Sequence, residues 1–178
     1  MSGEIISRHR ALYLEQLDID FNHTVTQYLP ELGRASLSFM FGWKRTELSL
    51  QDALILSRQR DMAVGNTSIG PHRADWRVDY QNLPNRETLS RGQEKLTALA
   101  CVMAQAENYA QRKHEWPVVC MDDLASELDV QHQEQVLAHL SQSQAQVILT
   151  ATETPIILAK QIALERRFHV KQGVVSQL

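Results

Sequence analysis

An apolar run leads into two adjacent carboxylates in residues 118–129, which read VVCMDDLASELD. Val118 to Met121 is short, apolar and uncharged, which indicates a buried strand of a parallel sheet. Open α/β sheets bind ligands beyond the carboxyl ends of their strands, where Asp122 and Asp123 follow. One of these carboxylates can hold Mg²⁺ through its water shell, while the other orients or deprotonates a water for attack on a γ-phosphate. A paired-acid turn between strand and helix explains the same residues.

A second polar segment opens the long helix that precedes this strand. Residues 89–93 read LSRGQ, and Ser90 with Gln93 has the spacing of a capping box, in which both side chains satisfy free backbone N–H groups. The helix is expected from Arg91 to about Arg112. A capped helix start that contains glycine also forms an anion site, because its N–H groups and its dipole face outward together. A capped helix that binds nothing remains the alternative.

The rest of the chain alternates helical and extended segments. Apolar spacing predicts one or two amphipathic helices over residues 4–29, and a helix capped by Ser49 that runs to about Arg60. A period of two predicts strands at 37–41 and 76–80. The later segments are expected as a helix at 131–140, a strand at 147–150, a helix opening at Thr154-Pro155 and short strands over 168–175. This succession favours an α/β fold, a sheet with flanking helices.

Composition excludes several classes of protein. The chain has 178 residues, 43% of them hydrophobic, which suits a globular protein of one or two small domains. Its 18 basic and 21 acidic residues are balanced on both sides of residue 62, so DNA contact would need a local patch; pairs such as Lys44-Arg45 more often lie on solvated surface. No apolar run approaches the roughly 18 to 20 residues of a membrane helix, and no secretory signal is visible. Cys101 and Cys120 lie in apolar stretches, so we expect buried thiols and a cytoplasmic, reducing setting.

Together these segments resemble the ATPase heads of the ABC and SMC superfamily, and most closely the RecF family of bacterial recombinational repair proteins. LSRGQ is similar to the ABC signature. MDDLASELD, residues 121–129, is similar to Walker B plus the D-loop, with paired aspartates where transporters usually have Asp-Glu. GPHRAD, residues 70–75, resembles another RecF hallmark. Where transporter heads carry a switch histidine this chain has Thr150-Ala151-Thr152, which suits RecF better and leaves the sensor role of either threonine open.

The resemblance implies that ATP and Mg²⁺ bind between two protomers. The residues implied to contact the nucleotide held by the partner protomer are Ser90, Arg91, Gly92 and Gln93. Asp122 would support Mg²⁺, and Asp123 would be the catalytic acid–base residue. The D-loop residues implied at the interface are Ser126 and Asp129.

For His72 and Arg73 two interpretations stay open. The side chains could contact DNA phosphate or nucleotide, or they could cap elements that neighbour the turn at Gly70-Pro71. The sequence alone favours neither.

One expected motif is absent. A phosphate-binding P-loop requires Gly-Lys-Ser or Gly-Lys-Thr, and none of the seven glycines is followed by lysine. RecF-like proteins keep this loop in an N-terminal lobe, so the resemblance implies the C-terminal part of such a protein. Residues 1–62 would be a helical arm-domain remnant with a connecting strand and helix, and residues 63–178 the C-terminal lobe of the ATPase head. We expect ATP hydrolysis by the intact protein and none by this chain alone.

The implied role is that of a DNA replication and recombinational repair protein of the RecF type. An ATP-dependent homodimer would clamp double-stranded DNA or a single/double-strand junction, and with recombination mediator proteins would aid recombinase loading at gaps and the SOS response. No membrane partner is expected. The first alternative is a non-catalytic fragment that binds only DNA or a repair partner. The second, a transporter ATPase fragment, is disfavoured by the paired aspartates and the missing histidine.

Overall fold

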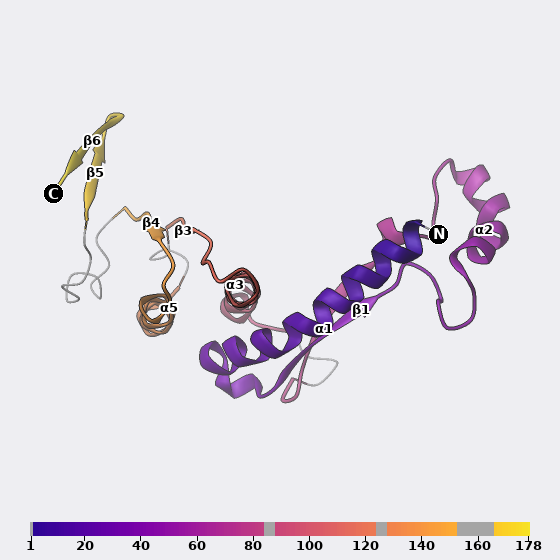
Figure 1. Ribbon diagram of the computed structural model, residues 1–178, viewed down its shortest axis with the longest axis horizontal. Helices are drawn as coiled ribbons and strands as arrows, with labels where there is room; N and C mark the ends of the chain where they lie inside the picture. The colour runs from indigo at the N-terminus through magenta and orange to yellow at the C-terminus, as the bar shows by residue number, and fades with distance from the viewer. Residues whose placement is uncertain (1, 84–87, 124–127, 153–165) are drawn as a thin grey trace. The chain divides into compact units, whose positions relative to one another are not determined.

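The computed structural model describes residues 2–83, 88–123, 128–152 and 166–178 (Figure 1). The chain divides into two compact units, Met1–Glu115 and Trp116–Leu178. Each unit combines helices with strands, as expected from the alternation in the sequence.

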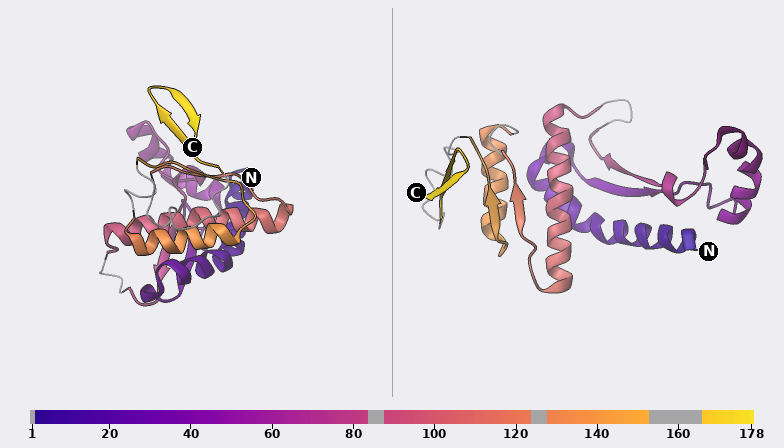
Figure 2. Two further views of the ribbon diagram at one scale, coloured as in Figure 1. Left: turned by 90° about the vertical axis from the view of Figure 1, so that its left-hand side faces the viewer. Right: turned by 90° about the horizontal axis from the view of Figure 1, so that it is seen from above.

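The first unit is built around α1 (Ser2–Tyr28), a single helix of 27 residues. The helix is continuous because no proline or further glycine interrupts residues 4–29, so the sequence alternative of two helices is wrong. It packs against β1 (Ala35–Met40) and α3 (Arg91–Lys113). Figure 1 shows β1 running alongside α1, and Figure 2 shows α3 crossing the C-terminal half of that helix.

The contact between α1 and α3 combines apolar burial with polar bonds. Phe21 and Val25 of α1 are fully buried, as is Met103 of α3. Beside them, the carboxylate of Asp20 accepts hydrogen bonds from two α3 amides, Asn108 Nδ2 at 2.9 Å and Gln111 Nε2 at 3.2 Å. Apolar burial supplies most of the stabilisation, and the directional bonds fix how the helices are aligned.

The two predicted strands of this unit are confirmed, and they pair with each other. β1 runs antiparallel to β2 (Asp75–Tyr80), from Ala35 opposite Tyr80 to Met40 opposite Asp75. The other edge of β1 is covered by side chains of α1. Asp18 Oδ1 accepts from the N–H of Leu37 at 2.5 Å, and Asn22 Oδ1 accepts from the N–H of Ala35 at 3.0 Å. Residues 18 and 22 are one helical turn apart, which suits the two-residue spacing of the strand donors.

The segment between β1 and β2 contains α2 (Leu50–Val64), and short 3-10 turns occur at Pro30–Leu32 and Pro71–Arg73. Ser49 caps α2 as predicted, accepting from the N–H of Asp52 at 3.1 Å. The two ends of the segment between β1 and β2, called the α2 lobe below, meet closely. Here the N–H of Gly70 donates to the carbonyl of Gly42 at 3.1 Å. A Cβ at Gly42 would lie 2.0 Å from the Gly70 oxygen, so only glycine fits. Residue 62 falls inside α2, and the division into arm remnant and head lobe stays a prediction.

The second unit contains a parallel pair of strands and a helix between them. β3 (Val119–Met121) pairs with β4 (Val147–Leu149). The helix α5 (Val130–Gln142) lies between these two strands in the sequence. Val119 is buried, but Val118 and Cys120 are exposed, so the expectation of a fully buried strand is wrong. Alternate side chains point to opposite faces, and the described residues cover one face of this pair.

The two cysteines differ in their environment. Cys101 of α3 is buried, and its desolvation raises the pKa of the thiol to about 11. Cys120 of β3 is exposed, contrary to expectation. Both thiols are free.

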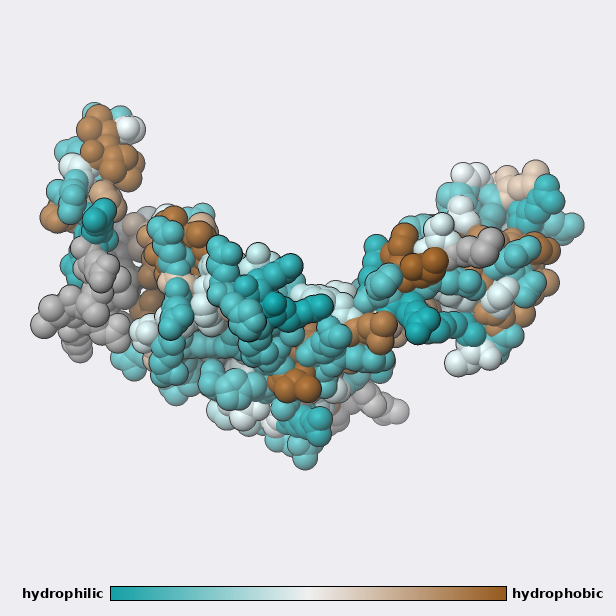
Figure 3. All heavy atoms as spheres, in the orientation of Figure 1, coloured by the Kyte–Doolittle hydropathy of each residue, from teal (hydrophilic) through white to brown (hydrophobic). Residues whose placement is uncertain are grey.

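A hairpin ends the chain. β5 (Phe168–Lys171) and β6 (Val174–Gln177) pair antiparallel, close to the strands expected over 168–175. Figure 3 shows apolar surface on this hairpin, where Phe168, Val170, Val174 and Val175 are each more than half exposed. The helix predicted to open at Thr154-Pro155 lies outside the described residues. In the described ranges no helix is long and apolar enough to cross a membrane.

Replacing Phe21 by alanine tests the importance of the α1–α3 contact. Phe21→Ala removes a fully buried ring and should lower the free energy of unfolding by about 3–5 kcal/mol. Ile19→Ala, on the same helix but at a side chain that is 75% exposed, should change it by less than about 0.5 kcal/mol. Urea unfolding followed by far-ultraviolet circular dichroism measures both. Equal losses in the two variants would contradict the assigned core.

Candidate functional site

Asp122 and Asp123, called the acidic turn below, lie beyond the carboxyl end of β3. The parallel register pairs Met121 with Leu149, and the N–H of Thr150 donates to the carbonyl of Met121 at 3.0 Å. This extra ladder bond brings Thr150 beside the acidic turn. Its hydroxyl donates to Asp122 Oδ1, and the N–H of Asp123 donates to Thr150 Oγ1 at 3.2 Å. A single threonine therefore bonds to both acidic residues.

The chemistry of the acidic turn fits a cation that keeps most of its water shell. Asp122 is exposed, and across the described ranges no group of three or more His, Cys, Asp or Glu side chains could enclose a metal ion. Mg²⁺ is usually held by one or two carboxylates while water and substrate phosphates complete its octahedron. Asp122 can fill that role, whereas a zinc site would need three or four protein ligands.

Asp129, predicted for the D-loop, is the N-cap of α5. Its Oδ1 accepts from the backbone N–H of His132 at 3.0 Å, and its Oδ2 lies 2.8 Å from His132 Nδ1. The backbone hydrogen bond from His132, followed by the bond to its ring, lowers the pKa of the Asp129 carboxyl. In this structure the carboxylate is thus engaged at the start of its own helix. Ser126, the other predicted D-loop residue, lies outside the described residues.

The predicted capping box is confirmed at the start of α3. Ser90 Oγ accepts from the N–H of Gln93 at 3.3 Å, and Gln93 Oε1 accepts from the N–H of Ser90 at 3.0 Å. Ser90, Arg91 and Gly92 are exposed, and a Cβ added at Gly92 would meet no atom within 4 Å. The helix start is therefore both well ordered by its cap and open to solvent, as an anion site requires.

A contact that the sequence analysis missed fixes the capping glutamine. Gln93 Nε2 donates to Glu31 Oε1 at 3.2 Å, across 62 positions of sequence. No local pattern signals such a pair, because Glu31 belongs to the 3-10 turn after α1. The helix start is thereby tied to the turn that follows the central helix.

His72 and Arg73 hold the neighbouring loop. His72 Nε2 lies 3.0 Å from the carbonyl oxygen of Thr67, and Arg73 donates to the same oxygen through Nε at 3.3 Å and Nη2 at 3.2 Å. Arg73 Nη2 also donates to Asn66 Oδ1 at 3.3 Å. These contacts fit the second interpretation, in which the two side chains cap elements that neighbour the turn at Gly70-Pro71. Both side chains are exposed, and a role in contacting DNA or nucleotide stays a prediction.

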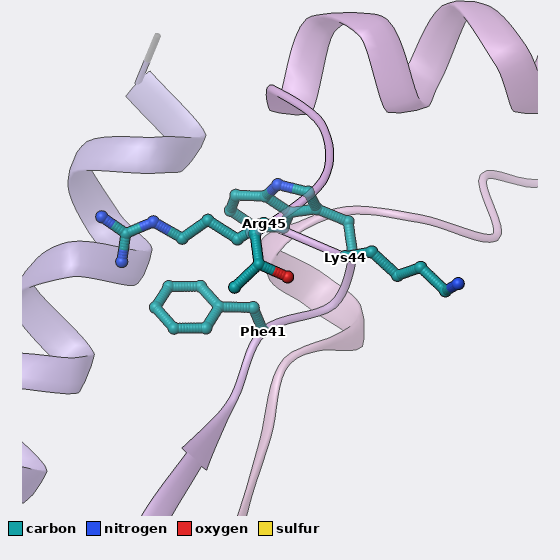
Figure 4. Close-up of a pocket in the computed structure, with 5 residues that line it drawn as sticks. Phe41, Lys44 and Arg45 are labelled. Atoms are coloured by element: carbon teal, nitrogen blue, oxygen red, sulfur yellow. The ribbon is translucent and has the colours of Figure 1, made fainter.

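A hollow of about 410 Å³ lies between β1 and α2, lined by Phe41, Trp43, Lys44, Arg45 and Thr46 (Figure 4). The Arg45 guanidinium lies over the Phe41 ring, 4.7 Å from its centroid, while Lys44 extends in the other direction. Trp43 is only 8% exposed and packs with Leu50 and Ala53 in a buried cluster. This hollow was not predicted, although alternating aromatic residues run directly into the basic pair Lys44-Arg45 in the sequence.

The family described as RecF/RecN/SMC N terminal domain matches residues 10–176. The chain belongs to this family. Two relatives, both named DNA replication and repair protein RecF, support the RecF branch that the signature and Walker B segments indicated. The protein of Xanthomonas euvesicatoria pv. vesicatoria (strain 85-10) is 52% identical over 176 residues, 99% of this chain and 48% of the relative. The protein of Stenotrophomonas maltophilia (strain R551-3) is 49% identical over 174 residues, 98% of this chain and 48% of the relative.

Solved structures agree on the fold. A structure described as the recombination mediator protein RecF-ATP in the RecFOR pathway matches with a TM-score of 0.76 and 23% identity, covering 99% of this chain and 47% of that one. An SMC head bound to the C-winged helix domain of ScpA matches with a TM-score of 0.50 and 16% identity, covering 93% and 42%. The chain therefore has the fold of an SMC/RecF ATPase head, mixed in helix and strand. It spans about half the length of the curated relatives that it matches.

Acidification should remove the stabilisation that Asp129 gives to α5. Because the folded-state pKa of Asp129 is lowered, its contribution is complete above the ordinary value of 3.8 and is lost as the pH falls through the lower folded-state value. Asp129→Asn keeps an N-cap acceptor without a titrating charge. The stability difference between wild type and this variant should therefore shrink between about pH 6 and about pH 2.5. Urea midpoints at both pH values measure it, and a constant difference would contradict the role of the charge.

Proposed function

We propose that this chain supplies the signature and Walker B half of a RecF-type ATPase head, acting in DNA replication and recombinational repair. The observation that carries the proposal is the 52% identity to a RecF protein over 99% of the chain, because that span includes both the open helix start and the acidic turn. In this proposal the intact protein clamps DNA in an ATP-dependent manner. It thereby aids recombinase loading at single-strand gaps and the SOS response.

The open start of α3 is the proposed contact for the nucleotide. Its free N–H groups and the positive end of the helix dipole favour a phosphate, and the exposed Gly92 lets one approach closely. Ser90, Arg91 and Gln93 would add side-chain donors. Following the family resemblance, these residues would meet the γ-phosphate of an ATP held by a second protomer. Formation of the homodimer would then depend on ATP.

The acidic turn is the proposed site of hydrolysis. Asp122 would hold Mg²⁺, which when bound neutralises charge on the phosphates. Asp123 would orient the attacking water or take its proton. Ser126 and Asp129 would contact the partner protomer as the D-loop. For Asp129 this requires its carboxylate to share or exchange its present bonds with His132.

ATP and Mg²⁺ binding would need a second lobe. The chain has no Gly-Lys pair, so it lacks the lysine and the loop that neutralise β- and γ-phosphates. We therefore assign residues 63–178 to the C-terminal lobe of the head and residues 1–62 to the arm remnant. The isolated chain would not hydrolyse ATP.

DNA and recombination mediator proteins are the proposed partners, in the cytoplasm. One matched structure is described as a recombination mediator in the RecFOR pathway, which supports this assignment by relation. For DNA, phosphate contacts need only a local cluster of donors. Exposed His72 and Arg73 would provide one, and Arg45, held over Phe41, a second.

A non-catalytic module is the alternative that the missing Gly-Lys pair favours. Such a module would bind DNA or a repair partner without using nucleotide. DNA binding that is unaffected by ATP and by Asp122→Ala, in the presence of every part of the head, would support this alternative.

Nucleotide binding by two complementary halves tests the proposal. The complementing half is a polypeptide covering the part of the Xanthomonas euvesicatoria RecF protein that this chain does not match. A fluorescent ATP analogue with Mg²⁺ should bind the mixture of the two and neither half alone, because each half lacks ligands for the phosphates. Fluorescence anisotropy measures the affinity.

Ser90→Arg provides the variant for this experiment, because a bulky side chain at the helix start should weaken binding by the mixture at least about tenfold. Arg112→Ala, at an exposed position in the last turn of the same helix, is the control and should bind as wild type. Tight binding by the chain alone would refute the half-head assignment. Binding by the Ser90→Arg mixture at wild-type strength would refute the signature role.

A further inference from the structure

Thr150 connects two acidic residues that lie 27 and 28 positions earlier in the sequence. It follows β4 directly, at the point where the parallel ladder ends, and its own N–H makes the last ladder bond to Met121. Its side chain is the part that reaches the acidic turn. We propose that Thr150 is a positioning residue, whose hydroxyl holds the Asp122 carboxylate and the Asp123 backbone in one arrangement and leaves Asp122 Oδ2 to receive a divalent cation. This inference rests on the proposed function, in which Asp122 supports Mg²⁺.

The direction of each hydrogen bond follows from the atoms involved. A backbone N–H can only donate, so Thr150 Oγ1 accepts from Asp123. The single hydroxyl hydrogen is then directed at Asp122 Oδ1, which as part of a carboxylate can only accept. Both capacities of the hydroxyl are thus used at the acidic turn. A bond to a charged acceptor is also stronger than one between neutral groups.

The bond from Asp123 to Thr150 falls where the backbone leaves β3 in an uncommon conformation. Asp123 has a φ of +47°, in the left-handed region, which few residues other than glycine adopt readily, although Asp and Asn are among them. This conformation turns the chain out of β3. Thr150 Oγ1 accepts from the N–H of Asp123 at 3.2 Å at this residue, so the hydroxyl helps to hold the turn.

The free side of Asp122 determines what the arrangement can bind. From the described residues Oδ2 of Asp122 receives no hydrogen bond, while Oδ1 is occupied by Thr150. A carboxylate held by one oxygen presents the other in a fixed direction. Ligating carboxylates are commonly hydrogen-bonded in this way, and loss of such a partner lowers metal affinity about 10- to 100-fold.

Two substitutions separate positioning by the hydroxyl from simple packing. Thr150→Val keeps the branched shape, which suits a strand end, but removes the donor and acceptor. Thr150→Ser keeps the hydroxyl and loses a methyl group. Thr152→Val is the matched control, because it makes the same change at an exposed threonine two residues later.

The first measurement is amide hydrogen exchange of Asp123 by NMR in the chain itself, without nucleotide or metal. The Asp123 amide should exchange at least about tenfold faster in Thr150→Val, and close to wild type in Thr150→Ser and Thr152→Val. An Asp123 amide that stays equally protected in Thr150→Val would overturn the inference.

The second measurement is a Mg²⁺ titration of ATP-analogue binding by this chain mixed with the complementing half. The Mg²⁺ concentration for half-maximal binding should rise about tenfold or more in Thr150→Val, and Thr150→Ser should restore it. Affinity in EDTA should not change, whereas a folding defect would lower it.

The outcomes distinguish the two hypotheses. If the wild-type mixture binds no nucleotide, the proposed function fails and this inference fails with it. If the wild-type mixture binds nucleotide and Thr150→Val has the same Mg²⁺ requirement, the proposed function stands and the positioning role of Thr150 is refuted.

Discussion

Burial of one face of α1 is the interaction on which the first unit depends. Phe21, Val25 and Tyr28 are almost completely removed from solvent, and each such side chain contributes roughly 1.5–3 kcal/mol through the hydrophobic effect. The same helix also serves β1, since Asp18 and Asn22 satisfy donors along the strand edge. Desolvation, followed by the nearby Glu107 carboxylate, raises the pKa of Tyr28, so the phenol stays neutral in the core. One helix thereby organises both its partner helix and the sheet.

This packing determines how the helix start at Ser90 is presented. Towards the end of α3, Asn108 and Gln111 donate hydrogen bonds to Asp20. Nearer the start of α3, Thr97 Oγ1 lies 2.6 Å from the hydroxyl of Tyr80. The start itself is held by its capping box. A helix fixed at several points along its length offers its N–H groups without further ordering, which reduces the entropy lost when an anion binds. The acidic turn is organised differently, by a parallel register and one hydroxyl.

Local rules predicted those features that depend on neighbouring residues. The capping box needs only Ser90 and Gln93, and the cap of α2 needs only Ser49 and Asp52, so both were found from spacing. The exposure of Cys120 was not predicted, because it depends on which face of β3 is covered. The bond from Gln93 to Glu31 and the contacts of Thr150 join distant positions, and they require a tertiary register that no local pattern contains. The roles of His72 and Arg73 stayed open for the same reason.

The amide bonds to Asp20 also carry a consequence for folding during synthesis. They join positions 88 and 91 residues apart, so the apolar face of α1 stays without its partner until α3 has left the ribosome. At about 5–20 residues per second this interval is on the order of ten seconds. During that time the apolar face of α1 is exposed surface of the kind that chaperones bind. The Gly42–Gly70 contact closes the α2 lobe over a much shorter loop. This lobe can therefore form before α3 has been synthesised.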